Sequence, residues 1–87
     1  MRHFASPRFW ECYVHLPAPA RQLADKCFEL LKKNPHHASL HFKKIGKYRS
    51  VRVGLQYRAL AVQVRDGLVW FWIGTHSDYD RLLEGPM

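Results

Sequence analysis

The stretch LHFKKIGKYRSVRVGLQYRALAVQVRDGLVWFWIGTHSDY, residues 40–79, combines strand-like alternation with most of the positive charge of this 87-residue chain. Up to residue 76 it holds one acid, Asp66, against seven basic residues, which are Lys43, Lys44, Lys47, Arg49, Arg52, Arg58 and Arg65. That excess accounts for nearly all of the formal net charge of +7. Basic strands interleaved with tyrosine and histidine are typical of surfaces that bind phosphates, so nucleic acid is the first partner to consider.

Hydrophobic residues in this stretch recur at every second position, which predicts β-strands. A turn at residues 45–47, a bend at 54–56 and the hairpin signal Asp66-Gly67 divide the stretch. The last strand is apolar on both faces, which predicts an interior position in the sheet or cover on each side. The strands predicted in this way are residues 40–43, 50–55, 57–64 and 68–74.

Helical periodicity precedes the strands, after a strand-like lead-in at residues 1–5. Ser6 and Pro7 are typical of an N-cap and a first helical position, and they predict a helix over residues 7–16. Prolines at positions 17 and 19 end that helix, because proline lacks the amide donor and restrains the residue before it. A second amphipathic helix is predicted from Pro19 to residue 33, and Asn34-Pro35 ends it.

A short last helix is predicted over residues 79–83, with Ser77 or Asp78 as its cap and Gly85-Pro86 as its end. The fold class is therefore α+β. We expect an N-terminal helical hairpin packed on an antiparallel β-meander of about four strands, with a short C-terminal helix.

The length fits one domain, residues 1–87, and a hydrophobic content of 47% allows a core without metals or disulfides. Cys12 and Cys27 lie in helical patterns, which favours small core residues over ligands or nucleophiles. The N-terminus lacks the pattern of a signal peptide, and the longest apolar run, residues 68–73, is too short to cross a bilayer. We expect a cytoplasmic protein with no membrane association, metal or cofactor.

RNA cleavage through the 2′-hydroxyl suits these residue types. It requires a group that takes the hydroxyl proton, a cation that stabilises charge on the phosphate, and a group that protonates the leaving oxygen. Arginine and lysine can supply the cation, while histidine, tyrosine or lysine can move the protons. The acids fall in predicted helices, a turn and the C-terminal segment, which disfavours a metal-dependent nuclease.

Arg52 and Arg58 are the strongest candidates, because both lie near Gly54 at one end of a predicted hairpin and can share one phosphate. His76 follows the most buried strand, at a position where side chains reach clefts; its alternative is an ordinary loop or capping histidine. Tyr79 either joins the site or packs the last helix against the sheet. We expect the Arg58 guanidinium to project from the end of the sheet, and its structural alternative is an ion pair with Asp78 or Asp80.

The other cations have structural alternatives. Lys43 and Lys44 fit phosphate contact and the protection of an edge strand equally well. Arg49, Lys47 and Arg65 fit the solvated side or end of a strand better than a site, although Arg49 stays a candidate for RNA binding.

Aromatic and imidazole side chains outside the candidate site receive structural interpretations. His36, His37 and His41 lack a cysteine or carboxylate partner at suitable spacing, so surface positions are favoured over a metal site. Trp70 and Trp72 fit the core better than a base-stacking platform.

The order of elements and two fragments resemble the RelE/ParE toxin superfamily of bacterial type II toxin–antitoxin modules. The fragments are VRVGLQYR, residues 51–58, and GTHSDY, residues 74–79, and the resemblance extends over nearly the whole chain. It implies a RelE-like fold. In RelE-like members it implies metal-independent cleavage of mRNA on the ribosome, countered by a cognate antitoxin, and in ParE-like members it implies poisoning of DNA gyrase.

The resemblance also implies roles for single residues. Arg52 matches a basic position on the second strand that contacts or activates RNA, and Arg58 matches an arginine that holds the scissile phosphate. His76 falls where members carry a late arginine or histidine, and Tyr79 is nearest to the C-terminal aromatic residue. The chain departs from RelE at Ser50, where RelE has another basic residue, and in the closer spacing of Tyr79 to His76.

The leading hypothesis from sequence is a ribosome-dependent mRNA endonuclease toxin with an antitoxin partner and no cofactor. Arg52 and Arg58 stabilise the phosphate, His76 or Tyr79 moves protons, and Lys43, Lys44 and Arg49 contact RNA. The alternatives are a ParE-like protein that binds gyrase without cleaving RNA, and a plain RNA-binding module.

Overall fold

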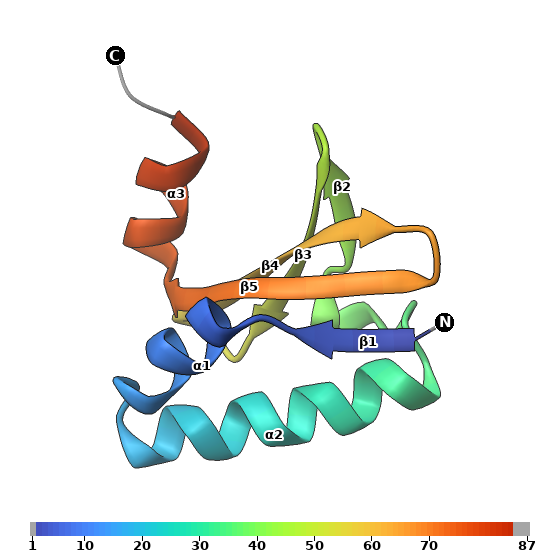
Figure 1. Cartoon of the computed structure of the whole chain (residues 1–87). Helices are drawn as coiled ribbons and strands as arrows, with labels where there is room; N and C mark the ends of the chain where they lie inside the picture. The colour runs from blue at the N-terminus through green and yellow to red at the C-terminus, as the bar shows by residue number, and fades with distance from the viewer. Residues whose placement is uncertain (1, 85–87) are drawn as a thin grey trace.

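A computed structural model describes residues 2–84, which form an α+β fold around a five-stranded mixed sheet (Figure 1). The strand order is β1-β5-β4-β3-β2, and β1 runs parallel to β5 while the other pairs are antiparallel. The predicted meander is therefore confirmed, and the lead-in adds a fifth strand. The strands are β1 (Arg2–Ala5), β2 (Lys43–Ile45), β3 (Tyr48–Val53), β4 (Tyr57–Val64) and β5 (Gly67–Thr75); the helices are α1 (Pro7–Val14), α2 (Ala18–Lys33) and α3 (His76–Glu84).

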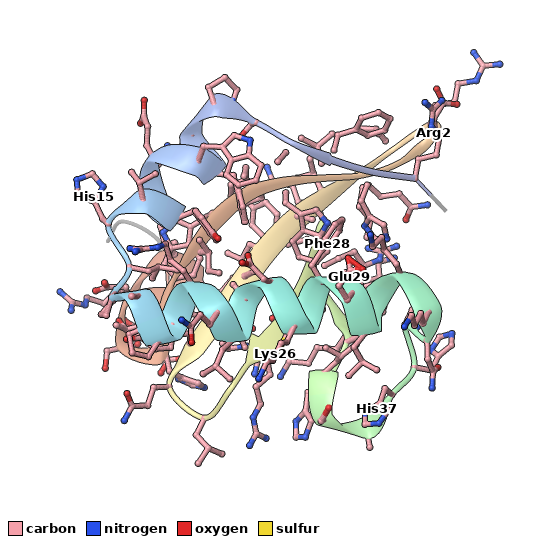
Figure 2. The ribbon with its side chains drawn as sticks, turned by 90° about the horizontal axis from the view of Figure 1, so that it is seen from below. Arg2, His15, Lys26, Phe28, Glu29 and His37 are labelled. Carbon is pink, nitrogen blue, oxygen red and sulfur yellow. The ribbon has the colours of Figure 1, made fainter. Side chains whose placement is uncertain are left out.

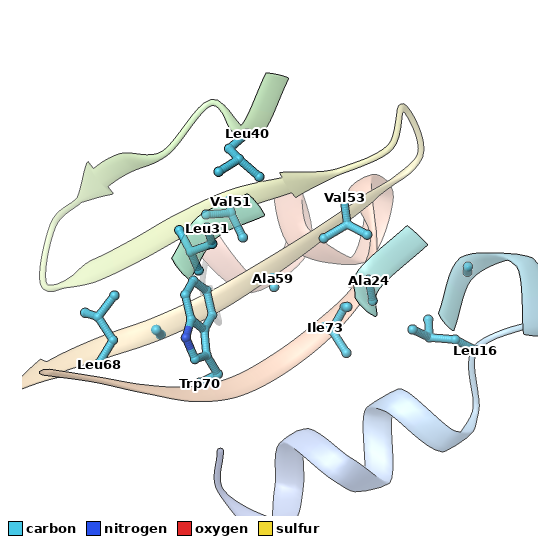
Figure 3. Close-up of a cluster of buried hydrophobic side chains, with 12 residues drawn as sticks. Leu16, Ala24, Leu31, Leu40, Val51, Val53, Ala59, Leu68, Trp70 and Ile73 are labelled. Carbon is cyan, nitrogen blue, oxygen red and sulfur yellow. The ribbon is translucent and has the colours of Figure 1, made fainter. Parts of the chain in front are cut away.

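The two faces of the sheet have different covers. Helices α1 and α2 pack on one side, called the helix face, and α3 packs on the other, called the α3 face (Figure 1). The helix face holds the larger core, shown in Figure 3, which includes Leu16, Ala24, Leu31, Leu40, Val51, Val53, Ala59, Leu68, Trp70 and Ile73. A smaller cluster on the α3 face contains Leu60, Trp72 and Tyr79. Both tryptophans predicted as core residues are buried.

The helical hairpin forms for the predicted reasons. Ser6 Oγ accepts a hydrogen bond from Phe9 N at 3.3 Å, so Ser6 is the N-cap, and Pro7 opens α1. The helix ends at Val14, before the predicted residue 16. Tyr13 then donates to Asp25 Oδ1 at 2.7 Å, which ties α1 to α2. Figure 2, which looks at the molecule from below, shows α2 crossing in front of the sheet.

The predicted strand over residues 40–43 is wrong in most of its length. Residues Ala38–Leu40 form a 3₁₀ helix, in which Ser39 N donates to His37 Nδ1 at 3.2 Å. Leu40 is fully buried in the helix-face core. It is the last residue of the 3₁₀ helix and does not start a strand. Strand β2 begins at Lys43.

The hairpin between β4 and β5 turns one position before the predicted pair. Arg65 and Asp66 form the turn, and Gly67 already belongs to β5, paired with Val64. A Cβ atom at Gly67 would collide with the backbone of Arg2. The glycine is therefore needed for the close approach of β1, not for the turn itself.

The C-terminal helix starts earlier than predicted. Helix α3 begins at His76, and Thr75 Oγ1 accepts from Asp78 N at 3.2 Å. Thr75 thus provides the side-chain cap, and the predicted caps Ser77 and Asp78 are wrong because both lie inside the helix. The predicted end at residues 85–86 lies outside the described residues.

Both cysteines are free thiols, and both pack against the helix-face core. This agrees with their predicted role, and burial raises the pKa of the Cys27 thiol. Within residues 2–84, every helix is too short or too polar to span a membrane.

Candidate functional site

The strand register divides the predicted cations between the two faces. Arg52 in β3 lies directly opposite Arg58 in β4, and both belong to the α3 face. Lys43 pairs with Ser50 and therefore also lies on the α3 face, whereas Lys44 pairs with Arg49 on the helix face. The structure thus brings Lys43, Arg52 and Arg58 to one side and separates Lys44 and Arg49 from them.

Arg58 is buried, with 4% of its surface exposed. Its Nε and Nη2 both donate to Ser50 Oγ, at 3.1 and 2.9 Å, and its Cζ lies 4.9 Å from the centre of the Tyr79 ring. The prediction that this guanidinium projects from the end of the sheet is therefore wrong: α3 lies over it. The contact with Tyr79 is a cation–π interaction.

The positive charge of Arg58 has no carboxylate partner within residues 2–84. The sequence allowed an ion pair with Asp78 or Asp80, and the structure excludes both: Asp78 pairs with Arg81 at 2.9 Å, and Asp80 lies 3.2 Å from His76. A buried cation without a counter-charge is costly, because burial removes its hydration. Such a group is suited to bind an anion.

Arg52 has other hydrogen-bond partners than Arg58, although the two residues are cross-strand neighbours. Its Nε donates to Gly54 O at 3.2 Å, and its Nη1 lies 3.2 Å from His41 Nε2. His41 has a left-handed backbone with φ of 44° at the end of the 3₁₀ helix. Arg52 is half-buried, so its charge remains accessible to a ligand.

His76 is the first residue of α3 and stays exposed at 52% of its side-chain surface. Its backbone amide donates to Gln56 O at 2.8 Å, which fixes the start of α3 beside the turn between β3 and β4. Its ring Nδ1 lies 3.2 Å from Asp80 Oδ2. The carboxylate can orient the imidazole, which stays accessible because the side chain is exposed.

Tyr79 lies between the buried cation and the exposed histidine. Its ring centre is 4.9 Å from Arg58 Cζ and 5.5 Å from the His76 ring centre. The side chain is 4% exposed, and no residue in the range 2–84 forms a hydrogen bond with its hydroxyl. Tyr79 therefore packs α3 against the sheet, as one of its two predicted roles required.

Two residues near these arginines were not selected from the sequence, namely Ser50 and His41. Ser50 stands in alternation with Arg52 on the same strand, and that spacing places both on one face. The spacing alone does not reveal that Ser50 is fully buried against Arg58. Among residues 2–84, no group of three His, Cys, Asp or Glu side chains is placed to hold a metal ion.

The sequence of residues 20–81 matches the family model of the ParE-like toxin domain. The chain belongs to the ParE-like toxin family. It is a toxin of the RelE/ParE superfamily of type II toxin–antitoxin modules, as the resemblance in its sequence predicted. No curated protein matches the chain significantly by sequence.

Solved structures of toxins share the fold of this ParE-like chain. A chain of the RelB–RelE antitoxin–toxin complex from Methanococcus jannaschii matches with 22% identity and a TM-score of 0.69, covering 90% of this chain and 96% of that chain. YafQ from E. coli matches with 17% identity and a TM-score of 0.70 over the same shares. The isolated E. coli RelE toxin matches with 10% identity and a TM-score of 0.62, covering 94% of each chain. The fold is therefore RelE-like.

Proposed function

We propose that this ParE-like toxin is a metal-independent, ribosome-dependent mRNA endonuclease that acts in the cytoplasm and inhibits translation. The observation that carries the proposal is Arg58, a buried cation without a carboxylate partner in residues 2–84, held by a serine hydroxyl. Its planar fork can bind two phosphate oxygens, on which negative charge increases as the 2′-hydroxyl attacks.

In this proposal the other side chains divide the remaining work. Arg52 and Lys43 lie on the same face as Arg58 and hold adjoining phosphates of the RNA. His76, exposed and oriented by Asp80, transfers a proton at the reacting oxygen. Because the Tyr79 ring covers Arg58, the ring must move aside before a phosphate reaches the guanidinium. Lys44 and Arg49, on the helix face, contact RNA only outside this site.

Growth and RNA measurements test the proposal. The wild type, Arg58→Ala and His76→Gln are induced in a bacterial host, with mapping of mRNA 5′ ends and a reporter for DNA damage. Removal of a preorganised donor or proton-transfer group typically costs roughly a hundred- to a thousand-fold in rate, so both variants should stop inhibiting growth. Arg65→Ala, an exposed arginine in the turn before β5, is the matched control and should remain toxic.

Gyrase poisoning is the second candidate, favoured by the match to the ParE-like family model. Intact mRNA together with a DNA-damage response would establish it and refute the nuclease. RNA binding without mRNA cleavage or a DNA-damage response would support the third alternative, a plain RNA-binding module.

We also propose that a neighbouring gene encodes an antitoxin for this chain. The M. jannaschii relative was solved as an antitoxin–toxin complex, and the net charge of +7 favours an acidic partner segment laid over the basic sheet. Co-expression with the neighbouring protein should relieve toxicity and yield a stable complex. Purification of the wild type alone, in high yield from an unharmed host, would contradict this.

A further inference from the structure

Two buried polar side chains meet on the α3 face. Within the described range, Ser50 and Arg58 are the polar or charged residues with the lowest exposure, at 0% and 4%. Ser50 Oγ accepts from Arg58 Nε at 3.1 Å and from Arg58 Nη2 at 2.9 Å. One hydroxyl oxygen thus accepts both hydrogen bonds from the edge of the guanidinium formed by Nε and Nη2.

This contact leaves the end of the fork without a hydrogen-bond partner in residues 2–84. An arginine has five N–H donors, and Ser50 uses one on Nε and one on Nη2. Nη1 forms no hydrogen bond with residues 2–84, and Nη2 keeps a second hydrogen. The edge that remains has the geometry for two oxygens of one phosphate.

The partner is also neutral. A carboxylate at position 50 would satisfy the same donors, but it would cancel the positive charge that a phosphate requires. A serine hydroxyl fixes the side chain by hydrogen bonds and leaves the charge uncompensated. This combination is costly for folding and useful for anion binding.

We propose that Ser50 is the positioning residue of Arg58: a neutral acceptor that fixes the guanidinium for phosphate contact without neutralising it. The inference rests on the proposed function, because it assigns to Ser50 an effect on RNA cleavage that acts through Arg58.

Ser50→Asn and Ser50→Asp form a matched pair, nearly equal in size and different in charge. With purified toxin on programmed ribosomes, Ser50→Asp should show a kcat at least about a hundred-fold below that of Ser50→Asn with little change in KM, since the lost contact acts in the transition state. Thermal unfolding should rank the two in the opposite order, with Ser50→Asp the more stable. Equal kcat values in two folded variants would overturn the proposal.

Ser50→Ala and Ser50→Thr cover the case in which the larger side chains prevent folding. Alanine removes the acceptor, and threonine restores a hydroxyl on a residue that suits a strand. We expect kcat to fall at least about ten-fold in Ser50→Ala, because both hydrogen bonds from the charged guanidinium are lost, and to recover in Ser50→Thr. Full activity in a folded Ser50→Ala would also overturn the proposal.

An NMR measurement separates this inference from the proposed function. In the wild type the Arg58 Nε–H signal should exchange slowly with solvent, and Ser50→Ala should accelerate that exchange. If the wild type cleaves no mRNA and the Ser50 variants still alter this signal and growth inhibition together, the nuclease assignment fails and the positioning role stands. If the signal is unchanged by Ser50→Ala, the positioning role fails whatever the activity.

Discussion

The two faces of one sheet are built from alternate residues of the same strands, and they bury different kinds of side chain. On β3, Val51 and Val53 enter the apolar core between the sheet and helices α1 and α2, whereas Ser50 and Arg52 lie on the α3 face. The helix face buries a continuous apolar cluster. The α3 face buries a charged arginine and a serine beside a cluster of only a few residues.

This contrast separates stability from function. Apolar burial on the helix face stabilises the fold in proportion to the area removed from water. The buried charge on the α3 face opposes folding, because its hydration is lost and no carboxylate in residues 2–84 compensates it. A buried cation without a counter-charge fits the phosphate site proposed for Arg58. Substitutions on the two faces should therefore affect different measurements.

Arg58→Met should have the largest effect on activity. Methionine has a similar length and no charge, so we expect a loss of roughly a hundred- to a thousand-fold in cleavage rate. The free energy of unfolding should change by less than about 1 kcal/mol, because replacing a buried charge with an apolar side chain is often neutral or stabilising. Toxicity assays and denaturant unfolding measure the two effects.

The comparison would fail if Arg58→Met unfolded as readily as a core variant or remained fully toxic. The first result would make Arg58 a structural residue, and the second would remove it from the site.

Leu31→Ala tests the helix face. Leu31 is 3% exposed in the large core, so truncation should cost about 2 to 5 kcal/mol of unfolding free energy through lost burial and a cavity. The rate of cleavage per folded molecule should stay unchanged, as measured with ribosomes at a temperature where the variant is folded. A specific loss of rate would mean that the helix face shapes the site.

Tyr79→Phe tests the α3 face. Its expected effect on the unfolding free energy is smaller than that of Leu31→Ala and opposite in sign. Its hydroxyl is buried without a partner in residues 2–84, so its removal should raise the unfolding free energy by about 1 kcal/mol. The ring beside Arg58 remains, and we expect activity to persist. An inactive but stable Tyr79→Phe would instead show that this hydroxyl, and not His76, moves the proton.

Much of this fold follows from local sequence. The alternation of Val51 and Val53, the cap formed by Ser6 and the bend at Gly54 each act within a few residues, and all were predicted correctly. The alternation of Leu40 and Phe42 led to a wrong strand prediction. A buried leucine at the end of a 3₁₀ helix can stand two residues from the next apolar residue, as it would in a strand. Gly67 was assigned to a turn because the contact that requires a glycine there, with the backbone of β1, comes from a distant part of the sequence.

The candidate site, like the fold, could be predicted from the sequence only in part. The spacing of Arg49 and Arg52 on one strand already places them on opposite faces, so this separation was available from the sequence. The burial of Arg58 was not, because it depends on α3 returning over β4 and on the bond to Ser50. The assignments of catalytic and RNA-binding residues stay predictions.

The smallest expected effect concerns His3, beside the helix-face core. His3 Nδ1 accepts from Trp70 Nε1 at 3.1 Å, and its ring centre lies 5.7 Å from that of Phe28, a residue of α2 labelled in Figure 2. Burial lowers the pKa of His3, so the unfolded chain binds the proton more readily than the folded one.

The contribution of His3 to stability is therefore fully present above its ordinary pKa of about 6.5 and decreases as the pH falls through that value. Protonation at Nδ1 would also break the bond from Trp70. Glutamine keeps an acceptor but cannot titrate, so acidification from pH 7.5 to 5 should lower the melting temperature of the wild type more than that of His3→Gln. Because the wild type and His3→Gln share every other histidine, the difference isolates His3. An equal or smaller fall in the wild type would mean that the helix face tolerates a charged group, and the contrast with the α3 face would lose its basis.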